Sequence, residues 1–173
     1  MRIDSLLAHD VYESGMDKGT VRVLEFIAAQ LVLISAGIHL FLGVPRVLIY
    51  TRPSAVSYYL NSGAFPDPRP FLFTVSAIVV LAGLYALFNG LVARKKLYLL
   101  GIAMMVTYIG SWVFWHTVIN HGQAFLAAGG HTHGGGILTT VVQHLVEVPL
   151  DAASKLSEAG ATLIFGLLYW KTE

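Results

Sequence analysis

The sequence contains no cysteine and few charged residues. None of its 173 residues is a cysteine, which excludes disulfide bonds, thiolate metal sites, iron–sulfur clusters and cysteine nucleophiles. Charged residues make up 12% of the chain, roughly half the share found in a typical soluble domain. So few charges cannot solvate the surface of a protein of this size, and they predict lipid as its solvent. The net charge of +1 and the absence of a long basic run give no indication of a nucleic-acid partner.

The sequence contains long runs of apolar residues that carry almost no charge. A helix needs about 20 apolar residues to cross the ~30 Å core of a bilayer. Runs of this length occur at about 23–44, 71–93 and 97–119. Pro45 and Arg46 close the first run, and a turn-rich segment at 62–70 precedes the second. These three runs predict transmembrane helices.

The apolar segment at 137–170 is too long for one crossing. Its 34 residues would make a helix of about 51 Å. Pro149 lacks an N–H group and predicts a break. We therefore expect an interfacial helix at about 137–148 and a fourth span at about 149–170. The fold class is then all-α: an integral membrane four-helix bundle, built as a single transmembrane domain over residues 1–173.

The distribution of basic residues predicts the orientation of the spans. Short cytoplasmic loops carry an excess of lysine and arginine. An arrangement with both termini inside leaves three arginines in the outer loop and one lysine in the fourth span. The segment Met1–Thr20 is acidic and is not a secretory signal, so the first span would stay as an anchor in the cell membrane. The inner basic residues are Arg2, Lys18, Arg22, Arg94, Lys95, Lys96 and Lys171; the others are Arg46, Arg52, Arg69 and Lys155.

Six of the seven histidines fall on the predicted outer side. Neutral imidazole binds copper, zinc and iron, and two to four converging rings form a site. His39 and His116 lie on different helices at similar depth, as bis-imidazole ligation of a b-type haem requires. Solvated interfacial histidines are the alternative. The remaining outer histidines are His121, His131, His133 and His144; the pair His131 and His133 stands in a glycine-rich loop.

Polar residues form a narrow stripe along the last apolar segment. They are spaced three or four residues apart, which places them within about 80° on one helix face. A charge in hydrocarbon costs several kcal/mol, so the stripe is expected to face the bundle interior. A helix lying on the membrane surface is the alternative. The stripe consists of His144, Glu147, Asp151, Lys155 and Glu158, and Asp67 and Arg69 from the outer loop could join the chamber it lines.

The first span carries a short family resemblance. The segment Ser35–Phe41 holds a Gly-Ile-His element near the end of the span, and Pro45 follows it. This pattern resembles DoxX-type small four-helix membrane proteins. The resemblance covers mainly the first span, and it implies a link to respiratory or redox complexes without a defined chemistry.

Three functions fit these patterns. The first is a metal or haem site near the outer face, holding copper, zinc or iron, for electron transfer or metal handling as part of a larger respiratory assembly in the membrane. The second is a small proton-coupled transporter that uses Asp151, Lys155 and Glu158. The third is an accessory subunit that docks on membrane-protein partners or on a second copy. Hydrolase and phosphate-binding motifs are absent, and the sequence leaves open whether the chain is an enzyme. The first function would use His39, His116 and His144 as ligands, Glu147 and Asp151 beside them, and His121, His131 and His133 as a capture arm.

Overall fold

The computed structural model describes residues 16–63, 66–118 and 136–171. Within these ranges it contains six helices and no strand, which confirms the all-α prediction for this part of the chain. His121, His131 and His133 lie outside the described residues. The helices are α2 (Lys18–Tyr50), α3 (Pro53–Ser62), α4 (Arg69–Phe88), α5 (Arg94–Thr117), α6 (Ile137–Glu147) and α7 (Pro149–Lys171).

Helix α2 is longer than the apolar run that predicts it. It begins at an N-cap, where the carboxylate of Asp17 accepts a hydrogen bond from the backbone N–H of Thr20 at 2.9 Å. It then continues through Pro45 to Tyr50. The expectation that Pro45 ends this helix is wrong, because a single lost N–H bond is outweighed where a neighbouring helix packs alongside. Gly43 marks this close approach: a Cβ atom there would lie 2.6 Å from Oγ1 of Thr74 in α4.

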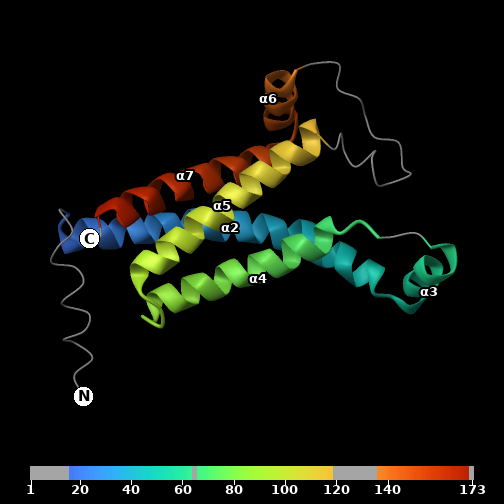
Figure 1. The fold of residues 1–173 in the computed structure, drawn as a ribbon, viewed down its shortest axis with the longest axis horizontal. Coiled ribbons are helices and arrows are strands. Elements are labelled where there is room, and N and C mark those ends of the chain that lie inside the picture. Colours follow the sequence, from blue (N-terminus) through green and yellow to red (C-terminus); the bar gives the residue numbers. More distant parts are fainter. Residues whose placement is uncertain (1–15, 64–65, 119–135, 172–173) are drawn as a thin grey trace.

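Four long helices run alternately up and down beside one another (Figure 1). Helix α2 packs against α4 and α7, and α5 packs chiefly against α7. Small residues permit this packing, since Ala28, Ala77 and Ala161 have no exposed surface. Gly101 of α5 lies under the ring of Phe165 of α7, where an added Cβ atom would come within 2.8 Å of the ring.

Three of these helices are long and apolar enough to cross a membrane: α2, α4 and α5. Helix α7 has 23 residues, or about 35 Å of length, but it carries Asp151, Lys155 and Glu158 in its first half. The outer faces of the long helices expose large apolar side chains such as Phe26, Ile78 and Leu163, which suits contact with lipid.

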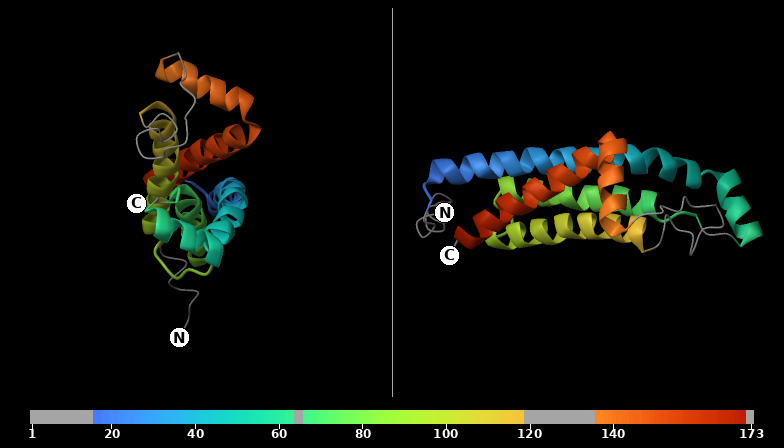
Figure 2. Two further views of the ribbon diagram at one scale, coloured as in Figure 1. Left: turned by 90° about the vertical axis from the view of Figure 1, so that its right-hand side faces the viewer. Right: turned by 90° about the horizontal axis from the view of Figure 1, so that it is seen from above.

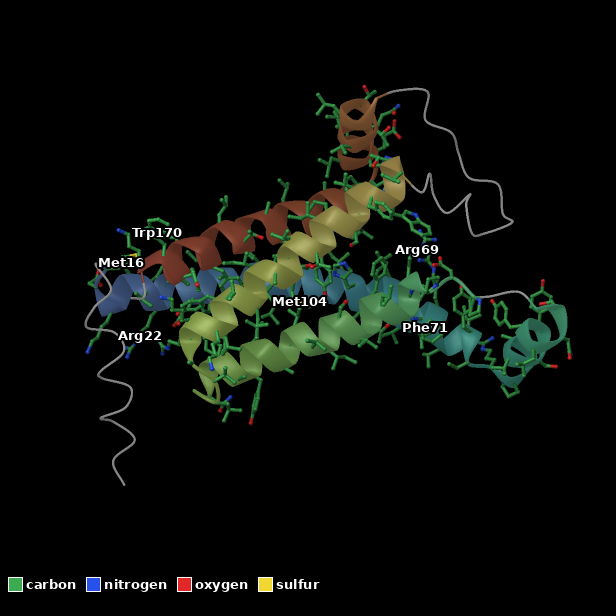
Figure 3. The ribbon with its side chains drawn as sticks, viewed as in Figure 1. Met16, Arg22, Arg69, Phe71, Met104 and Trp170 are labelled. Carbon is green, nitrogen blue, oxygen red and sulfur yellow. The ribbon has the colours of Figure 1, made fainter. Side chains whose placement is uncertain are left out.

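The two ends of the bundle differ in charge. Figure 3 shows Arg22 and Trp170 at one end and Arg69 and Phe71 at the other. Because the helices alternate in direction, the start of α2, the start of α5 and the end of α7 meet at the first end (Figure 1). Six basic residues of the described ranges lie there, namely Lys18, Arg22, Arg94, Lys95, Lys96 and Lys171. We call this end the basic end.

The last apolar segment is divided at Pro149. Helix α6 ends at Glu147, Val148 has an extended backbone (φ −118°, ψ 92°), and α7 starts at Pro149. Helix α6 therefore turns away from the axis of the bundle (Figure 2). The stripe predicted along a single helix face is split by this turn: Asp151, Lys155 and Glu158 stay on α7, whereas His144 and Glu147 belong to α6.

Candidate functional site

A fully buried carboxylate occupies the interior of the bundle. The side chain of Glu158 on α7 has no exposed surface. Its Oε2 atom lies 2.6 Å from Nζ of Lys155, one turn earlier on the same helix. Its Oε1 atom accepts hydrogen bonds from the hydroxyl of Ser154 at 2.6 Å and from that of Ser35 on α2 at 3.0 Å. Glu158 is thus an ion-paired carboxylate with both oxygens bonded.

His39 joins this cluster from α2. Its Nε2 atom lies 4.0 Å from Oε1 of Glu158, and its Nδ1 atom lies 3.4 Å from the hydroxyl of Ser35. The imidazole packs between two aromatic rings, with its centroid 4.2 Å from that of Tyr108 and 5.0 Å from that of Phe73. Because Tyr108 is on α5 and Phe73 on α4, all four long helices contribute to the surroundings of one histidine.

The energetics of this cluster depend on pairing. An ionised carboxylate or ammonium buried alone costs several kcal/mol, and removing one partner of a buried pair leaves that cost uncompensated. Lys155 donates to Glu158 and lies 3.4 Å from the carbonyl oxygen of Tyr108, so its ammonium also has two acceptors. We call Ser35, His39, Ser154, Lys155 and Glu158 the central cluster.

The central cluster lies deep in the bundle. Glu158 is nine residues after the start of α7, or about 13 Å along the helix, and 13 residues, or about 20 Å, before its end. His39 is 11 residues, or about 16 Å, from the end of α2. Both residues are therefore far from the basic end and more than two turns from the opposite end.

A second polar group lies nearer that opposite end. Nε1 of Trp112 donates a hydrogen bond to Oδ2 of Asp151 at 3.1 Å. The His116 ring packs against Trp112 on the same helix and against His144 of α6, with ring centroids 4.6 and 4.3 Å apart. Nδ1 of each histidine faces a backbone carbonyl oxygen one turn earlier, at 2.8 Å for His116 and 3.0 Å for His144. Since a carbonyl only accepts, each Nδ1 atom carries a proton.

Of the predicted metal and haem ligands in the described part of the chain, only His116 and His144 come together, and His39 does not join them. There, no group of three or more histidine, aspartate or glutamate side chains is arranged to hold a metal ion. His39 contacts Tyr108, whereas His116 is eight residues, or about 12 Å, further along α5. This separation does not fit one haem iron between the two rings. Glu147 is exposed on α6.

Asp67 and Arg69 form a pair of their own before α4. Nε of Arg69 lies 2.9 and 2.8 Å from the two carboxylate oxygens of Asp67, and its guanidinium stacks over Trp115 at 4.1 Å. Burial raises the pKa of Asp67, but the hydrogen bonds and charge of Arg69 outweigh it and hold that pKa below its ordinary value. These two residues do not contact the central cluster through any bond found in the structure's described residues.

A third polar group lies at the basic end and was not predicted from the sequence. Glu25 of α2 is 6% exposed. Its Oε1 atom accepts a hydrogen bond from the hydroxyl of Tyr98 at 2.5 Å and lies 3.3 Å from Nη1 of Arg94, both on α5. The signal that could have found it is a lone glutamate within an apolar run, because such a residue needs a buried partner.

Comparisons with protein-family models, with curated proteins and with solved structures find no match for this chain. The resemblance to DoxX-type proteins therefore stays a prediction, and the function is argued from the geometry alone.

Proposed function

We propose that this chain is a multi-pass protein of the cell membrane that binds and passes protons at the central cluster, as part of a small proton-coupled carrier. Four helices would cross the bilayer, with α7 as the fourth and with both termini in the cytoplasm. The observation that carries the proposal is the buried pair of Glu158 and Lys155, with His39 beside it, inside apolar helices.

The membrane topology has support in packing and charge. Helix α7 lies against both α2 and α5, and it buries Phe165 and Leu168 between them. A helix packed lengthwise between two apolar helices would share their environment. The basic end would be cytoplasmic under the positive-inside rule. Helix α6 would then lie at the outer interface, with Leu138 and Val146 exposed toward lipid headgroups.

The chemistry of the central cluster suits proton exchange. Ionisable residues within a membrane are costly and characteristically mark ion pathways and proton relays. Lysine and glutamate can each lose or gain a proton, and the 2.6 Å contact is short enough for a proton to move between them. A proton taken up by Glu158 would release Lys155 from its ion pair. His39, 4.0 Å away, would pass the proton on once a small movement closes that gap.

The test is proton flux into liposomes that contain the purified protein and a pH-sensitive dye, driven by an imposed membrane potential. Glu158→Gln keeps the shape of the side chain but removes the proton-binding group, so we expect flux to fall by about tenfold or more. Glu147→Gln is the matched control, because it removes an exposed carboxylate from α6 and should leave flux unchanged. Full flux in Glu158→Gln would reject the proposal.

A non-catalytic accessory subunit is the second candidate. The hydrogen bond from Ser35 to Glu158 also joins α2 to α7, and every oxygen of this carboxylate has a partner within the chain. Such a cluster could serve only to hold α7 in place. Stoichiometric co-purification of membrane partners, with no flux from the isolated protein, would favour this function over the first.

A further inference from the structure

Helices α2 and α5 face each other across the bundle axis. No Cα atom of described α2 lies within 8 Å of one of α5, while α7 packs against both. Polar and aromatic side chains nevertheless bridge the two helices at two levels. His39 meets Tyr108 at the level of the central cluster, and Glu25 meets Arg94 and Tyr98 at the basic end.

The bridge at the basic end closes the bundle there. Tyr98 is 1% exposed and its ring stacks on that of Phe165 of α7 at 6.1 Å. The Glu25 side chain is 7% exposed, whereas that of Arg94 is 34% exposed. Arg94 thus lies at the boundary between the buried group and water. Its guanidinium stays charged in both environments, because arginine does not lose its proton in proteins.

The interior above this bridge is apolar. Ala28 is one turn further along α2 and is completely buried, and Met105 and Phe165, beyond Tyr98 on the neighbouring helices, have at most 4% of their surface exposed. By contrast, polar side chains continue from the central cluster toward the opposite end, since Lys155 retains 11% of its side-chain surface and the partly exposed Asp151 precedes it by one turn. The structure is therefore closed toward the basic end.

We propose that Glu25, Arg94 and Tyr98 form an inner gate between α2 and α5, which must separate before the central cluster can exchange a proton with the basic end. This inference rests on the proposed function and assigns its regulation. Opening the gate separates the carboxylate of Glu25 from the guanidinium of Arg94 and from the phenol of Tyr98; no covalent bond changes. Water then hydrates both charges, which lowers the energetic cost of separating them.

At the basic end, one layer of side-chain contacts joins α2 to α5, and this arrangement suits a gate that opens better than a permanent structural contact. The bridge joins two helices whose backbones do not touch, so it can open without unpacking a backbone interface. Its cation already reaches water, and its carboxylate sits about 10 Å from the start of α2. These features place the closure at one end of the bundle, where a small outward tilt of either helix would admit water to Ala28.

The absence of native cysteine allows a direct test in lipid nanodiscs. Ala28→Cys introduces a unique thiol behind the gate, and a membrane-impermeant maleimide reports whether water reaches it. We expect slow labelling in this background and about tenfold faster labelling when Glu25→Gln is added, because loss of a charge-assisted bond raises the open population by that order. Arg94→Gln should have the same effect, and the exchange of the two charges, Glu25→Arg with Arg94→Glu, should restore slow labelling.

Ala77→Cys is the matched control, since Ala77 is equally buried but lies on α4. Its labelling should stay slow when Glu25→Gln is added. Unchanged labelling at Ala28→Cys in both gate variants would overturn the inference, and so would an equal rise at Ala77→Cys, which would mean general loosening. Absence of proton flux in the unmodified protein would reject the proposed function without changing the labelling result, so the two failures are distinguishable.

Discussion

Two buried carboxylates, Glu25 and Glu158, are held in the same protein by different means. Each pairs with one cation, and Glu25 accepts one hydrogen bond from a hydroxyl group whereas Glu158 accepts two. Glu158 takes its cation, Lys155, from its own helix, one turn away. Glu25 takes its cation, Arg94, from a different helix at the end of the bundle.

This difference separates a group suited to chemistry from one suited to mechanics. A lysine on the same helix moves with its glutamate, so helix movement does not break the pair, and only a change in protonation does. An arginine keeps its charge, so Arg94 cannot give up a proton to its carboxylate, and movement of α2 away from α5 separates the two groups. Cation identity and helix of origin together therefore suggest proton binding for Glu158 and gating for Glu25.

The largest expected effect follows from unpairing Glu158. Lys155→Met leaves the carboxylate buried without its cation, and we expect this change to lower the free energy of unfolding by about 3–5 kcal/mol. Adding Glu158→Leu removes the unpaired charge and should recover most of that loss. Thermal unfolding in nanodiscs measures both variants.

Removing the cation that pairs with Glu25 tests the same comparison at the basic end. Arg94→Met should cost less than Lys155→Met, because Arg94 is 34% exposed and water can reach the carboxylate that remains. An equal loss of stability in the two single variants would contradict the distinction between a central and a terminal pair.

The sequence predicts Glu158 but not Glu25, for a physical reason. Glu158 belongs to a local pattern, since Lys155 and Asp151 repeat at helical spacing on the same helix. The partners of Glu25 lie 69 and 73 residues away, and no local pattern specifies them. Apolar runs predict the helices well, because burial and lipid contact act on every residue of a span. They predict the end of α2 poorly, because packing at Gly43 carries the helix past Pro45.

The histidines show the same limit of prediction from sequence, because their contact partners depend on the tertiary structure. Position along a span predicts which end of the bundle a residue occupies, but not which way its side chain faces. His39 and His116 both lie nearer the end opposite the basic end, yet His39 contacts Glu158 and Tyr108 while His116 contacts Trp112 and His144. Convergence on one site requires helix rotation and pairing, which depend on tertiary packing.

Two tyrosine variants test whether the hydroxyl groups of Tyr98, at the basic end, and Tyr108, beside the central cluster, stabilise the protein. Tyr98→Phe removes the hydrogen bond to the carboxylate of Glu25, and we expect it to lower the free energy of unfolding by about 1.5–3 kcal/mol. Tyr108→Phe is the matched control on the same helix, because its buried hydroxyl lies near Ser76 but makes no hydrogen bond of normal geometry to the described residues. Its loss should change stability by less than about 0.5 kcal/mol. Equal destabilisation by both variants in thermal unfolding would show that the Tyr98 hydroxyl has no special role.

The pair of Asp67 and Arg69 lies outside the buried clusters and can be compared with the pairs of Glu25 and Glu158. Removing it is expected to have the smallest effect on the free energy of unfolding. Its contribution to stability is expected to be at most about 1 kcal/mol. Because the folded pKa of Asp67 is lowered, this contribution is present above the unfolded pKa of about 4 and is lost as pH falls through the folded pKa. The difference in unfolding midpoint between the unmodified protein and Asp67→Asn should therefore be largest at neutral pH and should shrink as acidification protonates the folded carboxylate. A difference that stayed constant across that range would mean that Asp67 stabilises the loop through its shape and not its charge.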